Sequence, residues 1–111
     1  MKKITVIGSG VGGLSVAIRL ASRGYNVRLY ESNESLGGKI GQTKLGGYRF
    51  DTGPSLFTQP KLIEELIRIC NKNPEEYFNY QKLEESCRYF FEDKTVIRGY
   101  SDPILLSKEI E

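Results

Sequence analysis

The residues best suited to chemistry lie near the amino terminus, where a glycine-rich run is followed about 20 residues later by a carboxylate. The run is Gly8-Ser9-Gly10-Val11-Gly12-Gly13, and the carboxylate is Glu31. Gly8 permits a tight turn, Gly10 lets backbone N–H groups approach a pyrophosphate, and Gly13 allows a helix to pack closely on a strand. Glu31 is suited to accept hydrogen bonds from a ribose diol. The pattern therefore predicts a dinucleotide site with its phosphates at a helix N-terminus.

Hydrophobic spacing predicts the elements that position these residues. We expect a parallel strand over residues 2–7, central in its sheet and buried on both faces, and a helix over residues 11–23. Gly24 falls where a helix usually ends in a left-handed residue, and a second parallel strand follows over residues 27–30, ending next to Glu31. The alternative is a glycine-rich turn in another kind of α/β protein. The strand before, the helix after and the downstream acid favour the dinucleotide site.

A second glycine pair follows in Gly37-Gly38-Lys39. It has two interpretations. One is an ordinary surface turn, because Gly-Gly pairs mark turns generally. The other is a further close approach of backbone to a phosphate or sugar, with Lys39 supplying positive charge.

Residues typical of turns and helix caps predict the elements in the rest of the chain. They predict a hairpin around Gly46-Gly47, a break over residues 51–55, and a helix that begins at Pro60 and ends before Asn73-Pro74. Two strands over residues 83–91 and 94–100 precede a further helix that begins at residue 103. No further strand follows, and a nucleotide-binding sheet needs more than two parallel strands. We therefore expect the chain to be the amino-terminal part of a longer protein.

Composition narrows the class of protein. The chain has 111 residues, of which 39% are hydrophobic and 27% charged, as in one small globular domain rather than a disordered segment. A formal net charge of +2 is too small to indicate binding to nucleic acid. The apolar run that follows Lys3 is too short for a signal peptide, and no stretch is long enough to cross a bilayer.

Residues that could react directly are few. Histidine is absent, which excludes a histidine triad and histidine metal ligands within the chain, so redox chemistry would need a bound cofactor. Cys70 and Cys87 form no CxxC pair and are interpreted as buried small hydrophobes in a reducing cytoplasm. For Tyr89, Phe90 and Phe91, core packing is favoured over the wall of an apolar pocket, because aromatic side chains chiefly serve packing.

Four motifs together resemble a known family. The first glycine run, Glu31, Gly37-Gly38-Lys39 and Phe50-Asp51-Thr52-Gly53-Pro54-Ser55 are similar to the start of the bacterial carotenoid (phytoene-type) desaturases, within the flavin-containing amine oxidase superfamily. The resemblance covers nearly the whole chain but only the amino-terminal part of a much longer enzyme. It implies an α/β fold, with residues 1–78 forming part of a Rossmann-like βαβ FAD-binding domain. Residues 79–111 would then begin a β-rich substrate domain.

The resemblance also implies which residues bind FAD. The superfamily commonly has arginine where Lys39 stands, and lysine keeps the charge without the bidentate fork. Within the implied site, the first glycine run lines the pyrophosphate, Glu31 binds the adenosine ribose, and the segment from Asp51 to Pro54 lies near the isoalloxazine ring. The implied cofactor-binding residues are Gly8, Ser9, Gly10, Val11, Gly12, Gly13, Glu31, Ser32, Gly37, Gly38, Lys39, Asp51, Gly53 and Pro54.

The implied activity is transfer of a hydride, or its equivalent, from a lipophilic polyene to the flavin. The resemblance further implies a cytoplasmic enzyme with peripheral contact at the inner face of the membrane, and we expect the 111-residue piece alone to be inactive. Three alternatives stay open. They are a flavin oxidase acting on amines or porphyrinogens, an NAD-binding Rossmann module without catalytic activity, and a vestigial nucleotide fold that binds neither cofactor.

Overall fold

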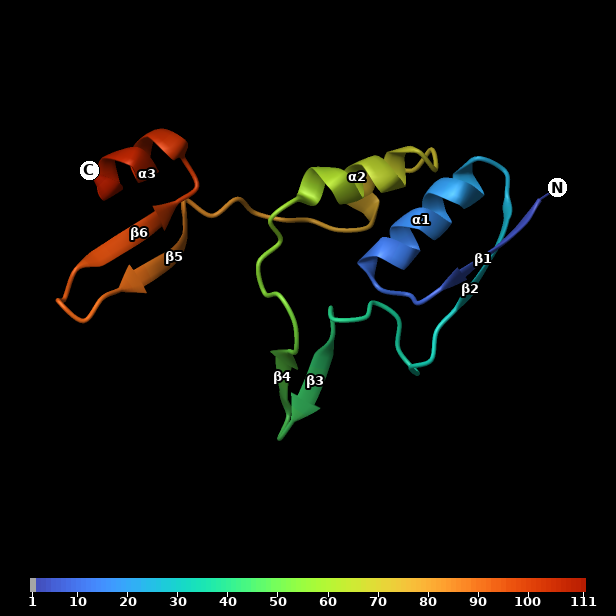
Figure 1. The fold of residues 1–111 in the computed structure, drawn as a ribbon, viewed down its shortest axis with the longest axis horizontal. Coiled ribbons are helices and arrows are strands. Elements are labelled where there is room, and N and C mark those ends of the chain that lie inside the picture. The colour runs from blue at the N-terminus through green and yellow to red at the C-terminus, as the bar shows by residue number, and fades with distance from the viewer. Residues whose placement is uncertain (1) are drawn as a thin grey trace. The chain divides into compact units, whose positions relative to one another are not determined.

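A computed structural model describes residues 2–111 of the chain, which divide into two compact units with the boundary between Phe78 and Asn79. Both units combine helices with short two-stranded sheets, so the chain is α/β (Figure 1). The first unit contains β1 (Lys3–Ile7), α1 (Val11–Ser22), β2 (Asn26–Tyr30), β3 (Gln42–Leu45), β4 (Tyr48–Asp51), α2 (Pro60–Arg68) and the short 3₁₀ helix η1 (Pro74–Glu76). The second contains β5 (Glu85–Phe90), β6 (Val96–Tyr100) and α3 (Pro103–Ile110).

The first unit begins with the predicted strand–helix–strand arrangement. β1 and β2 pair in parallel, with Ile4 opposite Val27 and Val6 opposite Leu29. These four side chains are half-buried where α1 packs on the sheet, and Figure 1 shows the helix lying along the strand pair. Gly24 follows the helix with φ +83°, the left-handed conformation expected after a helix C-terminus.

The prediction that β1 is buried on both faces is wrong. Its residues alternate between exposed and half-buried, and Ile7 is 87% exposed. The physical reason is that one face of the sheet is covered: among the elements of residues 2–111, α1 is the one that packs on β1 and β2. Hydrophobic residues in a strand show what it is able to bury, and the covering element decides what is buried.

The hairpin and the second helix form where the turn signals predict them. β3 and β4 pair antiparallel, and Gly46 and Gly47 form the two-residue turn with φ +56° and +83°, as a type I′ hairpin requires. α2 begins at Pro60 and buries Leu66, which is 6% exposed. An ion pair of 3.0 Å between the Arg19 guanidinium and the Glu65 carboxylate joins α1 to α2.

The second unit is a β-hairpin followed by a helix. β5 pairs antiparallel with β6, with Tyr89 opposite Ile97. The carboxylate of Asp102 caps α3 by accepting hydrogen bonds from the N–H groups of Ile104 at 2.7 Å and Leu105 at 3.3 Å. Within residues 2–111, no helix is both long enough and apolar enough to span a membrane.

Two predictions of burial are contradicted. Cys70 and Cys87 are exposed free thiols rather than buried hydrophobes. Tyr89, Phe90 and Phe91 are 54%, 75% and 51% exposed, so they are not core residues. In the second unit the physical reason is that α3 packs on β6, and a two-stranded hairpin leaves most of its side chains outside that contact. Cys70 lies in the first unit, just after the end of α2, where its side chain is exposed.

Candidate functional site

The turn out of β1 requires glycine at two positions. Gly8 has φ +92°, and its N–H donates to the carbonyl of Tyr30 at 2.7 Å, which ties the end of β1 to the end of β2. A Cβ atom on Gly13 would lie 2.0 Å from the carbonyl oxygen of Gly8, closer than two such atoms can approach. The first turn of α1 therefore packs directly on the loop backbone, because Gly13 has no side chain.

The N-terminus of α1 has the properties of an anion site. Gly10 is the N-cap residue, and no side chain caps it. The positions that Cβ atoms would occupy on Gly10 and Gly12 have no heavy atom within 4 Å. The first N–H groups of a helix lack intrahelical acceptors, and the helix dipole favours negative charge there. Open space beside these donors fits the pyrophosphate of a dinucleotide.

The second glycine pair packs against the first glycine loop. The N–H of Gly37 donates to the carbonyl of Ser9 at 2.9 Å, and Gly37 forms an isolated parallel bridge with Gly10. A Cβ atom on Gly38 would lie 3.0 Å from the Cα of Gly10. Neither interpretation of the pair from the sequence included this contact. Its approach to a phosphate or sugar stays a prediction.

The segment after β4 reaches the same region. The N–H of Thr52 donates to the carbonyl of Gly41 at 3.0 Å. A Cβ atom on Gly53 would lie 2.0 Å from the carbonyl oxygen of Lys39, so this approach requires glycine. The side chain of Asp51 pairs with Arg49 at 3.1 Å. The exposed Pro54 follows Gly53. Three glycine-containing segments that are far apart in the sequence are thus linked through their backbones.

Glu31 is the most heavily hydrogen-bonded side chain of the site. One oxygen, Oε2, accepts from the N–H of Ser9 at 2.8 Å and from its hydroxyl at 2.7 Å. The other oxygen, Oε1, accepts from the N–H groups of Ser32 at 2.8 Å and Asn33 at 2.9 Å. It also accepts from the Asn33 side-chain amide at 2.9 Å and the Ser32 hydroxyl at 3.3 Å. Glu31 therefore connects the glycine loop to the segment that follows β2.

These donors keep the Glu31 carboxylate ionised. Its pKa is lowered from 4.5 to about 2, chiefly by the hydrogen bond from the Ser9 hydroxyl and then by the N–H groups of Asn33 and Ser9. Hydrogen bonds to the charged form of a carboxyl group stabilise that form. An acceptor that is negatively charged at neutral pH, at the end of β2, suits the hydroxyl groups of a ribose.

The structure brings together most of the residues singled out in the sequence and adds one that was missed. Asn33 donates to Glu31 through both its N–H and its side-chain amide, and it was not among the expected site residues. Ser32 was among them, although its bonds to Glu31 were not foreseen. The available signal was the preference of Asn and Ser for local hydrogen bonds in turns, which applies directly after a strand that ends on a carboxylate.

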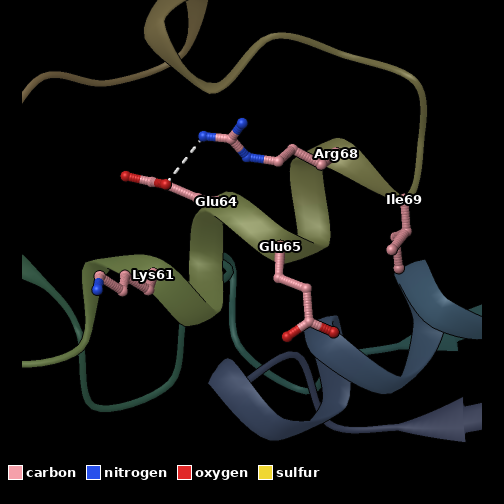
Figure 2. Close-up of a pocket in the computed structure, with 5 residues that line it drawn as sticks. All are labelled: Lys61, Glu64, Glu65, Arg68 and Ile69. Carbon is pink, nitrogen blue, oxygen red and sulfur yellow. Dashed lines mark hydrogen bonds and ion pairs between the residues drawn. The ribbon is translucent and has the colours of Figure 1, made fainter.

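A shallow depression on α2 lies apart from these loops. It is lined by Lys61, Glu64, Glu65, Arg68 and Ile69. Figure 2 shows the ion pair between Glu64 and Arg68, at 3.0 Å, and Glu65 directed toward α1. Both carboxylates thus form ion pairs, Glu64 with Arg68 and Glu65 with Arg19, as is usual for exposed charges on a helix. We regard this depression as a structural surface.

Curated relatives share most of the chain. It is 49% identical, over 102 residues, to a protein named 1-hydroxycarotenoid 3,4-desaturase from Flavobacterium sp. (strain P99-3), covering 92% of this chain and 21% of the relative. It is 41% identical over 118 aligned positions to 4,4'-diaponeurosporene oxygenase from Staphylococcus aureus (strain bovine RF122 / ET3-1), covering 99% of this chain and 24% of the relative. The same-named protein of strain USA300 is 40% identical over the same share. The similarity to carotenoid desaturases inferred from the motifs is confirmed, and the chain spans between a fifth and a quarter of the length of these relatives.

A family profile covers the part of the chain that forms the site. Residues 6–72 match the family described as NAD(P)-binding Rossmann-like domain, which is more than half of the 111 residues. The matched range includes the glycine loop, Glu31, the second glycine pair and Gly53. The strand–loop–helix–strand geometry and the ionised acid at the end of β2 agree with that description. The chain belongs to the family of Rossmann-like dinucleotide-binding domains.

Proposed function

We propose that this chain is the FAD-binding, amino-terminal part of an oxidoreductase of the carotenoid desaturase kind. The single observation that carries the proposal is its identity of 40–49%, over more than nine-tenths of its length, to relatives whose names specify carotenoid desaturation or oxygenation. The packing of Gly37 and Gly38 on the first glycine loop supports FAD, because a Rossmann turn for a nicotinamide dinucleotide needs no second glycine pair.

In this proposal, different residues of the chain bind different parts of FAD. The N-terminus of α1, with open space at Gly10 and Gly12, receives the pyrophosphate. Glu31 accepts hydrogen bonds from the adenosine ribose, and Lys39 adds positive charge near the phosphates. The backbone from Asp51 to Pro54, tied to the second glycine pair through Gly53, approaches the isoalloxazine ring.

Bound FAD supplies the chemistry that the side chains of this chain lack, by accepting a hydride or its equivalent from a carbon beside a carbon–carbon double bond. The substrate we propose is a lipophilic polyene. The names of the relatives include both a desaturase and an oxygenase. We propose desaturation for this protein, because the relative named a desaturase is 49% identical to this chain, whereas the relative named an oxygenase is 41% identical.

The test of the proposed activity uses the protein that carries this chain, purified with its bound cofactor. Anaerobic addition of a carotenoid should bleach the flavin absorbance and add a conjugated double bond to the polyene, seen as a red shift of its spectrum. An amine or a porphyrinogen should leave the flavin oxidised. Bleaching by the amine and not by the polyene would overturn the assignment. The 111-residue chain alone should give no turnover, and a desaturated product formed by it would contradict the proposal that it is only the cofactor-binding part of the enzyme.

A nicotinamide dinucleotide is the second candidate, and the printed description of the matched family favours it. In that case Glu31 would hold the ribose of NAD. Thermal melting in the presence of each cofactor separates the two. FAD should raise the melting temperature and NAD should leave it unchanged, whereas protection by NAD alone would assign the site to NAD.

We further propose that the protein works in the cytoplasm against the inner face of the membrane, because a polyene substrate dissolves in lipid. Cell fractionation tests this directly. The protein should sediment with membranes and be released by high salt or alkali without detergent. Recovery wholly in the soluble fraction while the polyene is being converted would contradict the proposal.

A further inference from the structure

The two oxygens of the Glu31 carboxylate have different surroundings. Oε2 faces Ser9, which is fully buried at 0% exposed and donates to it through both its N–H and its hydroxyl, at 2.8 and 2.7 Å. Both donors come from one residue of the glycine loop, and burial shields them from exchange with water. This side of the carboxylate is fixed to the fold.

Oε1 faces the exposed side and has more donors than it can satisfy well. Two are N–H groups of Ser32 and Asn33, and two are side-chain donors of the same residues. A carboxylate oxygen has about two lone-pair sites, so four donors compete for them. The N–H donors are set by the backbone, whereas the side chains of Ser32 and Asn33 are exposed, so rotation about their side-chain bonds could break these contacts without moving the backbone.

We propose that Ser9 is a positioning residue that fixes Glu31, and that the Asn33 side-chain amide is a placeholder that a ribose hydroxyl displaces from Oε1. This inference rests on the proposed function, because it requires a nucleotide ribose at Glu31. It assigns opposite effects on binding to two side chains that donate to the same carboxylate. Loss of the Ser9 hydroxyl leaves Oε2 with the Ser9 N–H as its one donor from the glycine loop, and so loosens the acceptor. Loss of the Asn33 amide removes a competitor.

The test uses ADP and 2′-deoxy-ADP as probes, because they share the phosphates and the adenine and differ in the ribose diol. Affinities are measured by titration calorimetry on the cofactor-free protein that carries this chain, unaltered and as Ser9→Ala and Asn33→Ala. The unaltered chain should prefer ADP by about tenfold, the size expected for a hydrogen bond to a charged acceptor. Ser9→Ala should lose most of that preference. Asn33→Ala should keep the preference and bind ADP roughly threefold more tightly, as expected on removal of one competing neutral donor.

The ratio of the affinities for ADP and 2′-deoxy-ADP distinguishes a loss of Glu31 positioning from a general loss of protein stability. A variant that is only less stable would weaken both ligands equally, so a selective loss of the preference for ADP identifies a change at the ribose. Asn33 is exposed, so its variant tests the placeholder role independently of how well Ser9→Ala folds.

Each contrary result has a distinct meaning. An unchanged preference in Ser9→Ala would overturn the positioning role, and equal or weaker ADP binding by Asn33→Ala would overturn the placeholder role. If the unaltered chain binds ADP and 2′-deoxy-ADP equally, the inference is wrong while nucleotide binding stands. If it binds neither of these probes nor FAD, the proposed function itself is wrong.

Discussion

At the scale of single residues, Glu31 links two loops through six hydrogen bonds, and these bonds stabilise its ionised form. The Ser9 donors come from 22 residues earlier in the chain, so the contact joins the beginning and the end of the βαβ unit. Because the pKa of Glu31 is about 2 in the folded chain and near 4.5 without these partners, folding is stabilised when the carboxylate is ionised. That stabilisation is complete above the unfolded pKa and is lost as the pH falls through the folded one.

Glu31→Gln tests this linkage. The neutral amide should lower the melting temperature at pH 7, because its NH₂ group meets protein donors where an oxygen accepted them. It should also flatten the dependence of melting temperature on pH between about 5 and 2, since the titrating group is gone. Melting curves by circular dichroism across this range measure both effects. Parallel pH profiles for the two proteins would show that Glu31 does not titrate with a lowered pKa.

The sequence was enough to identify the glycines and the acid as residues of the site, but not to predict the hydrogen bonds between Ser9 and Glu31. Glycine at a turn and an acid after a strand have local signatures, which the sequence displays directly. The hydroxyl of Ser9 finds its partner only after β1 and β2 lie side by side, so no local pattern indicates it. Asn33 was not predicted although its bonds to Glu31 are local, because asparagine is common in turns of every kind and its type alone does not identify a hydrogen-bond partner.

At the scale of elements, the position of α1 depends on the contact between its first turn and the loop that precedes it. Gly12 and Gly13 are adjacent in this turn and differ sharply in surroundings. A Cβ atom on Gly13 meets the carbonyl oxygen of Gly8 at 2.0 Å, whereas one on Gly12 has no heavy atom within 4 Å.

Gly13→Ala and Gly12→Ala therefore form a matched pair. The first should destabilise the chain by about 1–3 kcal/mol, because the helix has to move away from the backbone of the loop. The second should be neutral or stabilising by up to about 1 kcal/mol, since alanine favours a helix over glycine. Urea denaturation of both variants measures the difference. Equal stability of the two would show that α1 does not pack on the loop backbone as described.

Most elements were predictable because their signals are local. Proline begins α2 and α3, a left-handed glycine follows α1, and Gly46-Gly47 forms the turn of the β3–β4 hairpin. Burial was not predictable to the same degree. The apolar residues of β1 and the aromatic residues of β5 have the composition of core strands, yet much of their surface is exposed because few elements cover them.

At the scale of the whole molecule, large apolar side chains lie on the surface of both units. Ile7 in the first is 87% exposed, and Phe90 in the second is 75% exposed. Exposed apolar surface of this extent is uncommon on a soluble domain and is associated with interaction sites. The chain spans between a fifth and a quarter of the length of these relatives.

The exposure predicts that the folded chain binds a hydrophobic dye. Fluorescence of anilinonaphthalene sulfonate should rise on addition of the native chain, because the dye gains signal in apolar surroundings. Phe90→Ser should reduce the signal without changing the melting temperature, since this exposed side chain contributes little to packing. Absence of dye binding by the native chain would mean that these side chains are covered in solution.

The central claim is that the glycine loop and the N-terminus of α1 hold the pyrophosphate of FAD. Calorimetric titration of FAD into the cofactor-free protein that carries this chain, unaltered and as Gly10→Val, tests it most directly. Gly10 has φ −64°, which valine can adopt, and the position of a Cβ atom there has no heavy atom within 4 Å. The variant should therefore melt at the temperature of the unaltered chain. The account predicts one FAD bound per unaltered chain and none by the stable variant. FAD binding of equal strength by both, or by neither, would contradict it.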